Sequence, residues 1–337
     1  SVADVYNGWR DAFLELGCEI HEAHLDTDLN VFTAAEFKNE NTGERAKLFS
    51  LEAAWQMAMR SLYAECYRLW PDLVFNVYGM MVSPGVLRTI KGRRMRIATL
   101  FTESPYEDPT QLERCADLDI ALINDPTNFE AFRALNRNTW YQPHCYNPQV
   151  HCPGPFDPEE ASDFCFVGTG YPSRTEFFEA VDWSGIDAAF AGHWRYLSED
   201  SPLRTFLAHD VQHCCDNAET VRLYRGTKVS ANLYRQETEE GADHRGWAMG
   251  PRSVELAACG TFFLSEKRGE DDEVLPMVPA ITTPSEFGDQ VRHYLSRPAE
   301  RERIARQARA QIADRTFVNA ARTFLQRLER LPVSIPV

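Results

Sequence analysis

The chain has 337 residues, of which 44% are hydrophobic and 25% are charged, a composition typical of globular rather than disordered proteins. Its formal net charge of −15 argues against a broad basic surface that follows a nucleic-acid backbone, because such binding depends on neutralising phosphates. The length favours two domains. No apolar run approaches the ~20 residues that span a bilayer and no secretory signal is recognised, so we expect a cytoplasmic protein without a membrane span.

Periodicity predicts mainly helices in the first quarter of the chain. Residues 4–16 are expected to form an amphipathic helix and residues 18–23 a strand, whereas the polar stretch 26–47 is expected to be a loop. Apolar residues at helical spacing predict a helix over 51–69. Because an α/β domain normally places a strand before its first helix, we expect a further strand upstream of Ser1.

Strands and helices alternate in the rest of the chain. Before a proline-rich linker at 147–162, strands are predicted at 72–78, 95–101 and 120–124, and helices at 84–90, 109–115 and 126–135. After it, strands are predicted at 164–167, 188–191, 229–233 and 261–264, and helices at 174–181, 218–224, 249–260 and 284–295. Such alternation is typical of doubly wound parallel sheets, whose ligands bind outside the carboxyl ends of the strands.

The final apolar pattern predicts one long or kinked helix over 298–331, which would be long enough to cross from one domain to the other. We therefore divide the chain into a first domain at 1–155, a second domain at 156–315, and a helix at 316–337 that returns to the first domain.

The predicted helix at 249–260 presents its first turn to an anion. Pro251 is tolerated at a helix start, and the N–H groups around Arg252 and Ser253, together with the helix dipole, favour negative charge. Glu255 lies one turn further in, where a carboxylate accepts sugar hydroxyls. An arginine and a carboxylate three residues apart at a helix start suggest a nucleotide-sugar diphosphate. An ordinary surface Arg–Glu pair is the alternative.

Residues 168–174 (GTGYPSR) follow one predicted strand and open the next helix. Gly168 and Gly170 would let the backbone approach a ligand closely, and Arg174 could reach a phosphate. The stretch lacks the Gly-Lys-Ser/Thr of a P-loop and the third glycine of the dinucleotide fingerprint, so a plain glycine-containing turn is the alternative.

Two residues of the first domain are candidates for acid–base chemistry, because both follow predicted strands. Glu103 could act as a base or hold an acceptor hydroxyl, although acidic residues after strands are also common helix caps. His144 titrates near neutrality and could serve as a base or a donor, although a lone histidine is more often structural.

A zinc site is a further candidate, but a weaker one. His209 and His213 are four residues apart beside Cys214 and Cys215, a spacing that could place two imidazoles on one helical face. No glutamate follows the first histidine and no second cysteine pair lies nearby, so surface histidines at a helix end are favoured and we expect no metal. The nine cysteines show no framework spacing, which favours reduced thiols.

Taken in order, these pieces resemble the CgeB-like (spore-maturation protein) glycosyltransferases of the GT-B fold, which have a group 1 type C-terminal domain. The matching segments are 72–75 (DLVF), 120–125 (IALIND), 142–148 (QPHCYNP), 164–174 (FCFVGTGYPSR), 223–235 (LYRGTKVSANLYR), 252–260 (RSVELAACG) and 301–305 (RERIA). The resemblance implies two Rossmann-like doubly wound α/β domains facing a cleft, with a long C-terminal helix crossing back to the first domain.

The resemblance also implies an activity: metal-independent transfer of a sugar, of the hexosyltransferase type, from a nucleotide-diphosphate sugar such as a UDP-sugar to a hydroxyl acceptor. The donor serves as a substrate, and no cofactor is implied. Glu255 would hold the ribose hydroxyls, and Arg252 with the N–H groups of Ser253 and Val254 would hold the diphosphate. The remaining residues implied for donor binding are Gly168, Gly170, Arg174, His193, Lys228 and Asn232.

For the transfer itself, the resemblance implies Glu103 and His144 on the acceptor side and Arg252 at the leaving diphosphate. The wider retaining family has two glutamates with seven residues between them. Glu255 matches the second, but the first falls on Trp247, so the sequence leaves a retaining or an inverting outcome open.

The acceptor is also open and could be a small molecule, a glycan, a protein or modified DNA. A transferase acting on a hydroxymethylated base in DNA would need a local basic groove, for which Lys91, Arg93, Arg94 and Arg96 are the candidates; a solvated loop before a strand is the alternative for that run. A non-catalytic nucleotide-sugar-binding protein is the competing interpretation from another class.

Overall fold

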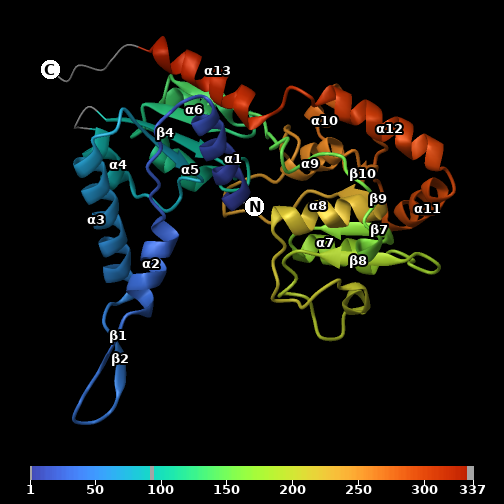
Figure 1. The fold of residues 1–337 in the computed structure, drawn as a ribbon, viewed down its shortest axis with the longest axis horizontal. Helices are drawn as coiled ribbons and strands as arrows, with labels where there is room; N and C mark the ends of the chain where they lie inside the picture. Colours follow the sequence, from blue (N-terminus) through green and yellow to red (C-terminus); the bar gives the residue numbers. More distant parts are fainter. Residues whose placement is uncertain (1, 92–94, 332–337) are drawn as a thin grey trace.

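The computed structural model describes residues 2–91 and 95–331 and folds them into two α/β halves, each built on a four-stranded parallel sheet (Figure 1). The prediction of two doubly wound α/β units is therefore confirmed. In the described residues, no helix combines the length and the apolar character that crossing a membrane requires.

The sheet of the first half has the order β3-β4-β5-β6. Its strands are β3 (Leu73–Val77), β4 (Arg96–Phe101), β5 (Ile120–Ile123) and β6 (Thr139–Tyr141). Successive side chains point to opposite faces, so Phe101 and Ile123 pack towards one helical layer while Leu100 and Leu122 pack towards the other. The helices on the first of these faces are α3 (Leu51–Leu69), α4 (Pro84–Lys91), α5 (Asp108–Cys115) and α6 (Phe129–Leu135).

The opposite face is covered by two helices from distant parts of the sequence, α1 (Val2–Glu15) and α13 (Phe317–Glu329). Trp9 is almost fully buried between them, with its ring 4.9 Å from that of Phe75 and 6.2 Å from that of Phe324. The core of the first half is thus completed by the last helix of the described chain.

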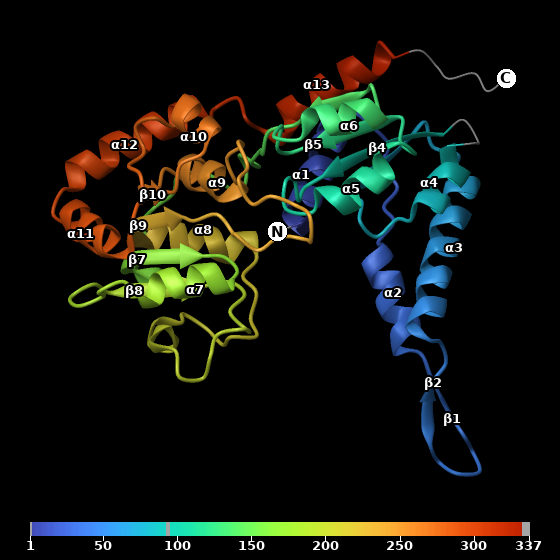
Figure 2. The ribbon, with the colours of Figure 1, turned by 180° about the vertical axis from the view of Figure 1, so that it is seen from behind.

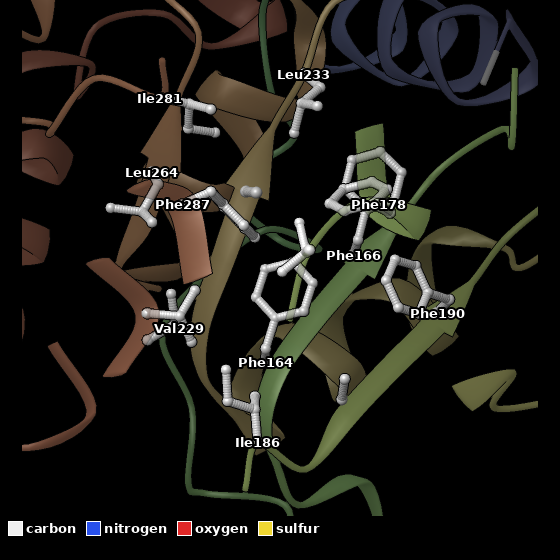
Figure 3. Close-up of a cluster of buried hydrophobic side chains, with 14 of the residues drawn as sticks. Phe164, Phe166, Phe178, Ile186, Phe190, Val229, Leu233, Leu264, Ile281 and Phe287 are labelled. Carbon is white, nitrogen blue, oxygen red and sulfur yellow. The ribbon is translucent and has the colours of Figure 1, made fainter. Parts of the chain in front are cut away.

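The sheet of the second half has the order β10-β9-β7-β8. Its strands are β7 (Ser162–Val167), β8 (Ala188–Ala191), β9 (Thr227–Asn232) and β10 (Phe263–Ser265). Phe164, Phe166 and Phe190 point to the face that also receives Phe178 and Phe287 (Figure 3). The helices and short 3-10 turns of this half are η1 (Pro158–Glu160), α7 (Pro172–Glu179), η2 (Pro202–Phe206), α8 (Asn217–Gly226), α9 (Pro251–Cys259), α10 (Gly269–Val274), α11 (Pro284–Leu295) and α12 (Pro298–Gln311).

The first quarter differs from the sequence-based expectation. Residues 18–23 form no strand, and the stretch expected to be a loop contains α2 (Leu25–Ala34) and a hairpin of β1 (Glu36–Lys38) and β2 (Arg45–Lys47). The helix forms because Leu25, Leu29 and Phe32, at helical spacing, pack against the α3 side of the core. The hairpin extends away from the rest of the molecule (Figures 1 and 2).

The long C-terminal helix is also divided, since α12 ends at Gln311 and α13 begins at Phe317. Thr316 starts the second helix as its N-cap, accepting a hydrogen bond from the backbone N–H of Asn319. Tyr146, in the other crossing between the halves, exchanges backbone hydrogen bonds with this break: its N–H donates to the carbonyl of Arg315, and its carbonyl accepts from the N–H of Phe317. The two crossings therefore run side by side.

Candidate active site

A cavity of about 420 Å³ is lined by residues of both halves that follow the carboxyl ends of their strands. This volume lies within the range of small-molecule sites, and the position is where parallel α/β sheets bind ligands. From the first half its wall includes Glu103, Tyr106, Asn124, Asp125, His144 and His151, together with one side of α1. From the second half it includes Tyr171, Arg174, Asn217, Asn232, Arg235, Arg252, Glu255 and Arg268.

Two arginines converge at the carboxyl ends of β7 and β9. Arg252 donates from Nε to the carbonyl of Val167 (2.8 Å) and from Nη1 to Oδ1 of Asn232 (3.2 Å). Arg174 donates to the carbonyl of Leu233 from both Nε and Nη2. Within residues 2–91 and 95–331, neither guanidinium forms an ion pair with a carboxylate. Positive charge is therefore concentrated at this wall of the cavity.

Burial makes the charge on Arg174 costly. Desolvation lowers the pKa of its guanidinium to about 9, and repulsion from Arg252 acts in the same direction. Aromatic rings also lie close to both groups: the guanidinium carbon of Arg174 lies 5.2 Å from the ring centre of Tyr171, and that of Arg252 lies 4.5 Å from that of Phe166. The Glu266 carboxylate acts on Arg174 electrostatically, without a direct ion pair. A bound anion would supply the missing countercharge.

The start of α9 borders the same wall. Gly250 is its N-cap and has no side chain to cap the first turn, so the N–H groups there are left to another acceptor. The predicted helix is found at Pro251–Cys259, followed by Gly260 in the left-handed region at φ 72°. Glu255 lies one turn in and lines the cavity.

Two glycines of the loop after β7 lie close to bulky side chains of the second half. A Cβ on Gly168 would overlap the guanidinium of Arg252, and a Cβ on Gly170 would overlap the ring of Trp194. Both glycines thus let the loop after β7 lie against side chains of the second half. They lie behind the cavity wall, so their contribution is to the packing that holds the arginines.

His144 lies at the first-half side of the cavity. Burial lowers the pKa of its imidazole to about 4, so the ring is neutral near pH 7. The Asn124 amide is oriented by its Oδ1, which accepts from the Ser104 N–H at 3.0 Å, so its Nδ2 donates to Nε2 of His144 at 3.0 Å. The proton of the neutral ring is then on Nδ1. This favours a donor role for His144 over the base role.

Glu103 is positioned by an arginine of the other half. Its Oε2 lies 3.2 Å from Nη2 of Arg235, which also lies 3.4 Å from Oε1 of Glu107. Burial raises the pKa of the Glu103 carboxyl, and Arg235 partly offsets the effect. A carboxylate with a raised pKa at the cavity wall suits proton transfer to or from a bound hydroxyl.

A second arginine also joins the halves. Arg268 donates from Nη2 to the hydroxyl of Tyr106, and its Nη1 lies 3.8 Å from Oδ2 of the buried Asp125. The same carboxylate accepts from the N–H of Ala248 at 2.9 Å. Sequence reasoning missed Arg235 and Arg268 as site residues, although both come soon after predicted strands, which was the available signal.

Several predicted donor residues lie outside the cavity lining. Lys228 is the clearest correction: it is at the amino end of β9, the opposite end from the cavity, and its Nζ pairs with Asp163 at 2.7 Å. His193 packs edge-on against the ring of Tyr196. Ser253 and Val254 are fully buried in α9, main chain included, and neither lines the cavity, so the structure does not expose the N–H groups that were predicted to hold the diphosphate.

The predicted basic run of the first half does not line the cavity where it is described. Lys91 donates to the carbonyl of Leu118, and Arg96 donates to the carbonyls of Leu328 and Leu331 at the end of α13. Both side chains therefore hold elements of the first half together. Arg93 and Arg94 lie outside the described residues.

Comparisons with known proteins agree with this architecture. Residues 174–327 match the sequence model of a family described as glycosyl transferase-like. Among curated proteins, none matches the chain significantly.

Three solved structures illustrate the similarity of fold. Sucrose-phosphate synthase from Thermosynechococcus elongatus aligns with a TM-score of 0.60 at 12% identity, covering 82% of this chain and 77% of that one. The UDP-forming α,α-trehalose-phosphate synthase from Burkholderia vietnamiensis aligns at 0.55 and 13% identity, covering 98% and 83%. Anabaena HepE in complex with UDP-glucose aligns at 0.56 and 12% identity, covering 82% of each chain. The chain therefore has the GT-B fold, with a glycosyl transferase-like region in its second half.

Proposed function

We propose that this protein is a glycosyltransferase that moves a sugar from a nucleotide-diphosphate sugar to a hydroxyl acceptor. The observation that carries the proposal is the pair Arg174 and Arg252, two guanidinium groups that form no direct ion pair with a described carboxylate and lie beside the start of α9, where no side chain caps the helix. A diphosphate would supply the negative charge that this wall lacks. The glycosyl transferase-like match over 174–327 supports the same conclusion.

The donor would lie across the second-half wall of the cavity. Its diphosphate would face the two arginines at the start of α9, and its ribose hydroxyls would reach Glu255. His151 is 3% exposed, and neither of its ring nitrogens has a hydrogen-bond partner in the described structure. Because His151 and Asn217 line the same cavity, we assign the nucleoside to their side of it.

The acceptor would bind against the first half. Its hydroxyl oxygen forms the new bond to the anomeric carbon, the bond from that carbon to the β-phosphate oxygen breaks, and the diphosphate leaves with the developing negative charge. Arg174, Arg252 and the α9 dipole would stabilise that charge, so the proposal requires no metal ion in the transfer. Glu103 would accept the hydroxyl proton, and His144 would donate a hydrogen bond from Nδ1.

Donor binding tests the proposal first. UDP, GDP, ADP, TDP and CDP and their sugar conjugates are titrated by calorimetry and thermal shift, beginning with UDP-glucose because of the Anabaena complex. A ligand at a hundredfold excess over its Kd stabilises the folded state by about 2.7 kcal/mol. We expect one nucleotide series to bind, and Arg174→Met and Arg252→Met each to weaken it at least tenfold.

Lys228→Met is the matched control, because it removes one positive charge at the far end of the second sheet. An equal loss of donor affinity in Lys228→Met would indicate a general effect of protein charge rather than binding at the proposed site. Absence of binding by every series would overturn the donor assignment. If a nucleotide sugar binds but neither transfer nor slow donor hydrolysis is detected over a broad acceptor panel, the non-catalytic binding protein is the correct interpretation.

A further inference from the structure

A second cluster of reactive side chains lies outside the cavity, in the segment that leads from η2 into α8. His213, Cys215 and Glu219 offer an imidazole nitrogen, a thiol sulfur and a carboxylate oxygen that all lie within 4.8 Å of one another. Nε2 of His213 is 3.0 Å and 3.1 Å from the two oxygens of Glu219. The three side chains belong to one segment of seven residues. Their nitrogen, sulfur and oxygen atoms are the ligand types that zinc binds in proteins.

The spacing fits a metal with little rearrangement. Zinc binds nitrogen and oxygen at about 2.0–2.2 Å and sulfur at about 2.3 Å, which places tetrahedral ligand atoms about 3.3–3.8 Å apart. The His213–Glu219 pair is already slightly closer than this, and Cys215 needs only a small side-chain movement. His213 and Glu219 are half exposed, so an ion can enter from solvent.

The backbone around the cluster is held by hydrogen bonds that a metal would leave in place. Asp216 and Glu219 form a capping box at the start of α8, in which the Asp216 N–H donates to Oε2 of Glu219 at 3.0 Å. Oε1 of Glu219 remains for a metal. The capping box thus fixes the carboxylate while leaving one oxygen to bind.

His209 positions the thiol and is not itself a ligand. Its Nε2 accepts from the N–H of Gly192 at 2.9 Å, and its Nδ1 is 2.8 Å from the carbonyl of Asp210, so both ring nitrogens are engaged. The same Nε2 lies 3.2 Å from Sγ of Cys215. The sequence suggested His209 and His213 as a pair on a helix, but both lie before α8, and the groups that join His213 are Cys215 and Glu219.

We propose that His213, Cys215 and Glu219 bind one divalent metal ion of the zinc class, with water in the fourth position. Binding replaces the thiol proton of Cys215, which is released to solvent, and Nε2 of His213 and Oε1 of Glu219 supply the other two protein ligand atoms.

The site would brace the entrance to α8 rather than take part in sugar transfer. Gly192 follows β8, and Asn217 is the first residue of α8 and lines the interdomain cavity. A metal on His213, Cys215 and Glu219 would tie the loop between these two points into one unit. The inference stands independently of the proposed function.

The test uses the full chain freed of metal with a chelator. Zinc is titrated against a chromophoric competitor, and Co²⁺ is added separately to observe thiolate-to-cobalt charge transfer. We expect one equivalent of metal per chain, a charge-transfer band, and loss of that band in Cys215→Ser with affinity lowered about 100-fold or more. Cys214→Ser is the matched control, because the neighbouring thiol is exposed and outside the ligand set.

Sub-stoichiometric binding, or a band that disappears in Cys214→Ser and survives in Cys215→Ser, would overturn the assignment. Thermal melts without metal separate loss of a ligand from loss of the fold. If Cys215→Ser is destabilised, Glu219→Gln decides, because its amide oxygen can still accept the capping hydrogen bond while the negative ligand is lost. Undiminished zinc affinity in Glu219→Gln would contradict the proposed ligand set.

Discussion

The neutral state of His144 makes acid stability a quantitative test of the site. The pKa of its imidazole is about 4 in the folded protein, against an ordinary value of 6.5. As pH falls, the unfolded chain therefore binds a proton first, and the folded state loses stability between pH 6.5 and pH 4. Because a pKa difference of one corresponds to about 1.36 kcal/mol, the loss approaches about 3 kcal/mol below pH 4.

His144→Gln removes this titration and should flatten that part of the stability profile. Urea unfolding gives the free energy of unfolding of the wild type and of the variant at pH 7 and at pH 4.5. The loss of stability between the two pH values is then compared between the two proteins. We expect about 2–3 kcal/mol less acid destabilisation in the variant. Parallel profiles for wild type and His144→Gln would refute the inferred burial cost.

The same variant separates the two chemical roles of the imidazole. Glutamine is neutral, can accept from the Asn124 amide and can donate into the cavity, so His144→Gln should keep more sugar-transfer activity than His144→Ala. If His144 acted as a general base, glutamine could not replace it, because an amide does not take up the proton. His144 acts as the base if both variants lose activity equally and the wild-type rate follows the ionisation of a single group near the His144 pKa of about 4.

Two further predictions concern packing. Trp9→Ala should lower the free energy of unfolding by about 3–5 kcal/mol, because it opens the core shared by α1 and α13. Leu14→Ala, at an exposed position, should change the free energy of unfolding by less than about 0.5 kcal/mol. Urea unfolding measures both variants, and similar losses would contradict the packing argument. Gly168→Ala should raise the Kd for the donor nucleotide about tenfold by displacing the Arg252 guanidinium, while Gly85→Ala, which meets no close neighbour, should not, as measured by calorimetry.

Local signals in the sequence were sufficient for much of the fold. Pro251 and Gly260 bracket α9 because each has a backbone reason to stand at its end of a helix. Strand β5 is a short apolar run buried on both faces, a pattern that needs no knowledge of neighbours. Helix α2 was missed because its polar residues conceal Leu29 and Phe32, whose partner surface on α3 is not adjacent in sequence.

The site was less accessible to sequence reasoning, because it depends on how two halves meet. Arg235 and Arg268 become site residues only through Glu103 and Tyr106, which belong to the other half. Lys228 illustrates the opposite error: a basic residue in a matching segment was assigned to a ligand, but its place at the start of β9 directs it to Asp163. The resemblance supplied residue types, and strand direction decided which of them reach the cavity.

The return of α13 to the first half has a consequence for synthesis. Trp9 and Phe13 emerge from the ribosome long before Phe317 and Phe324, yet these four side chains share one core. The strands and most of the helices of the second half have been synthesised earlier, by the end of α12. The usual order, in which the N-terminal unit matures first, is therefore reversed here. A nascent first half must wait, with one face of its sheet covered by α1 alone, until α13 has been synthesised.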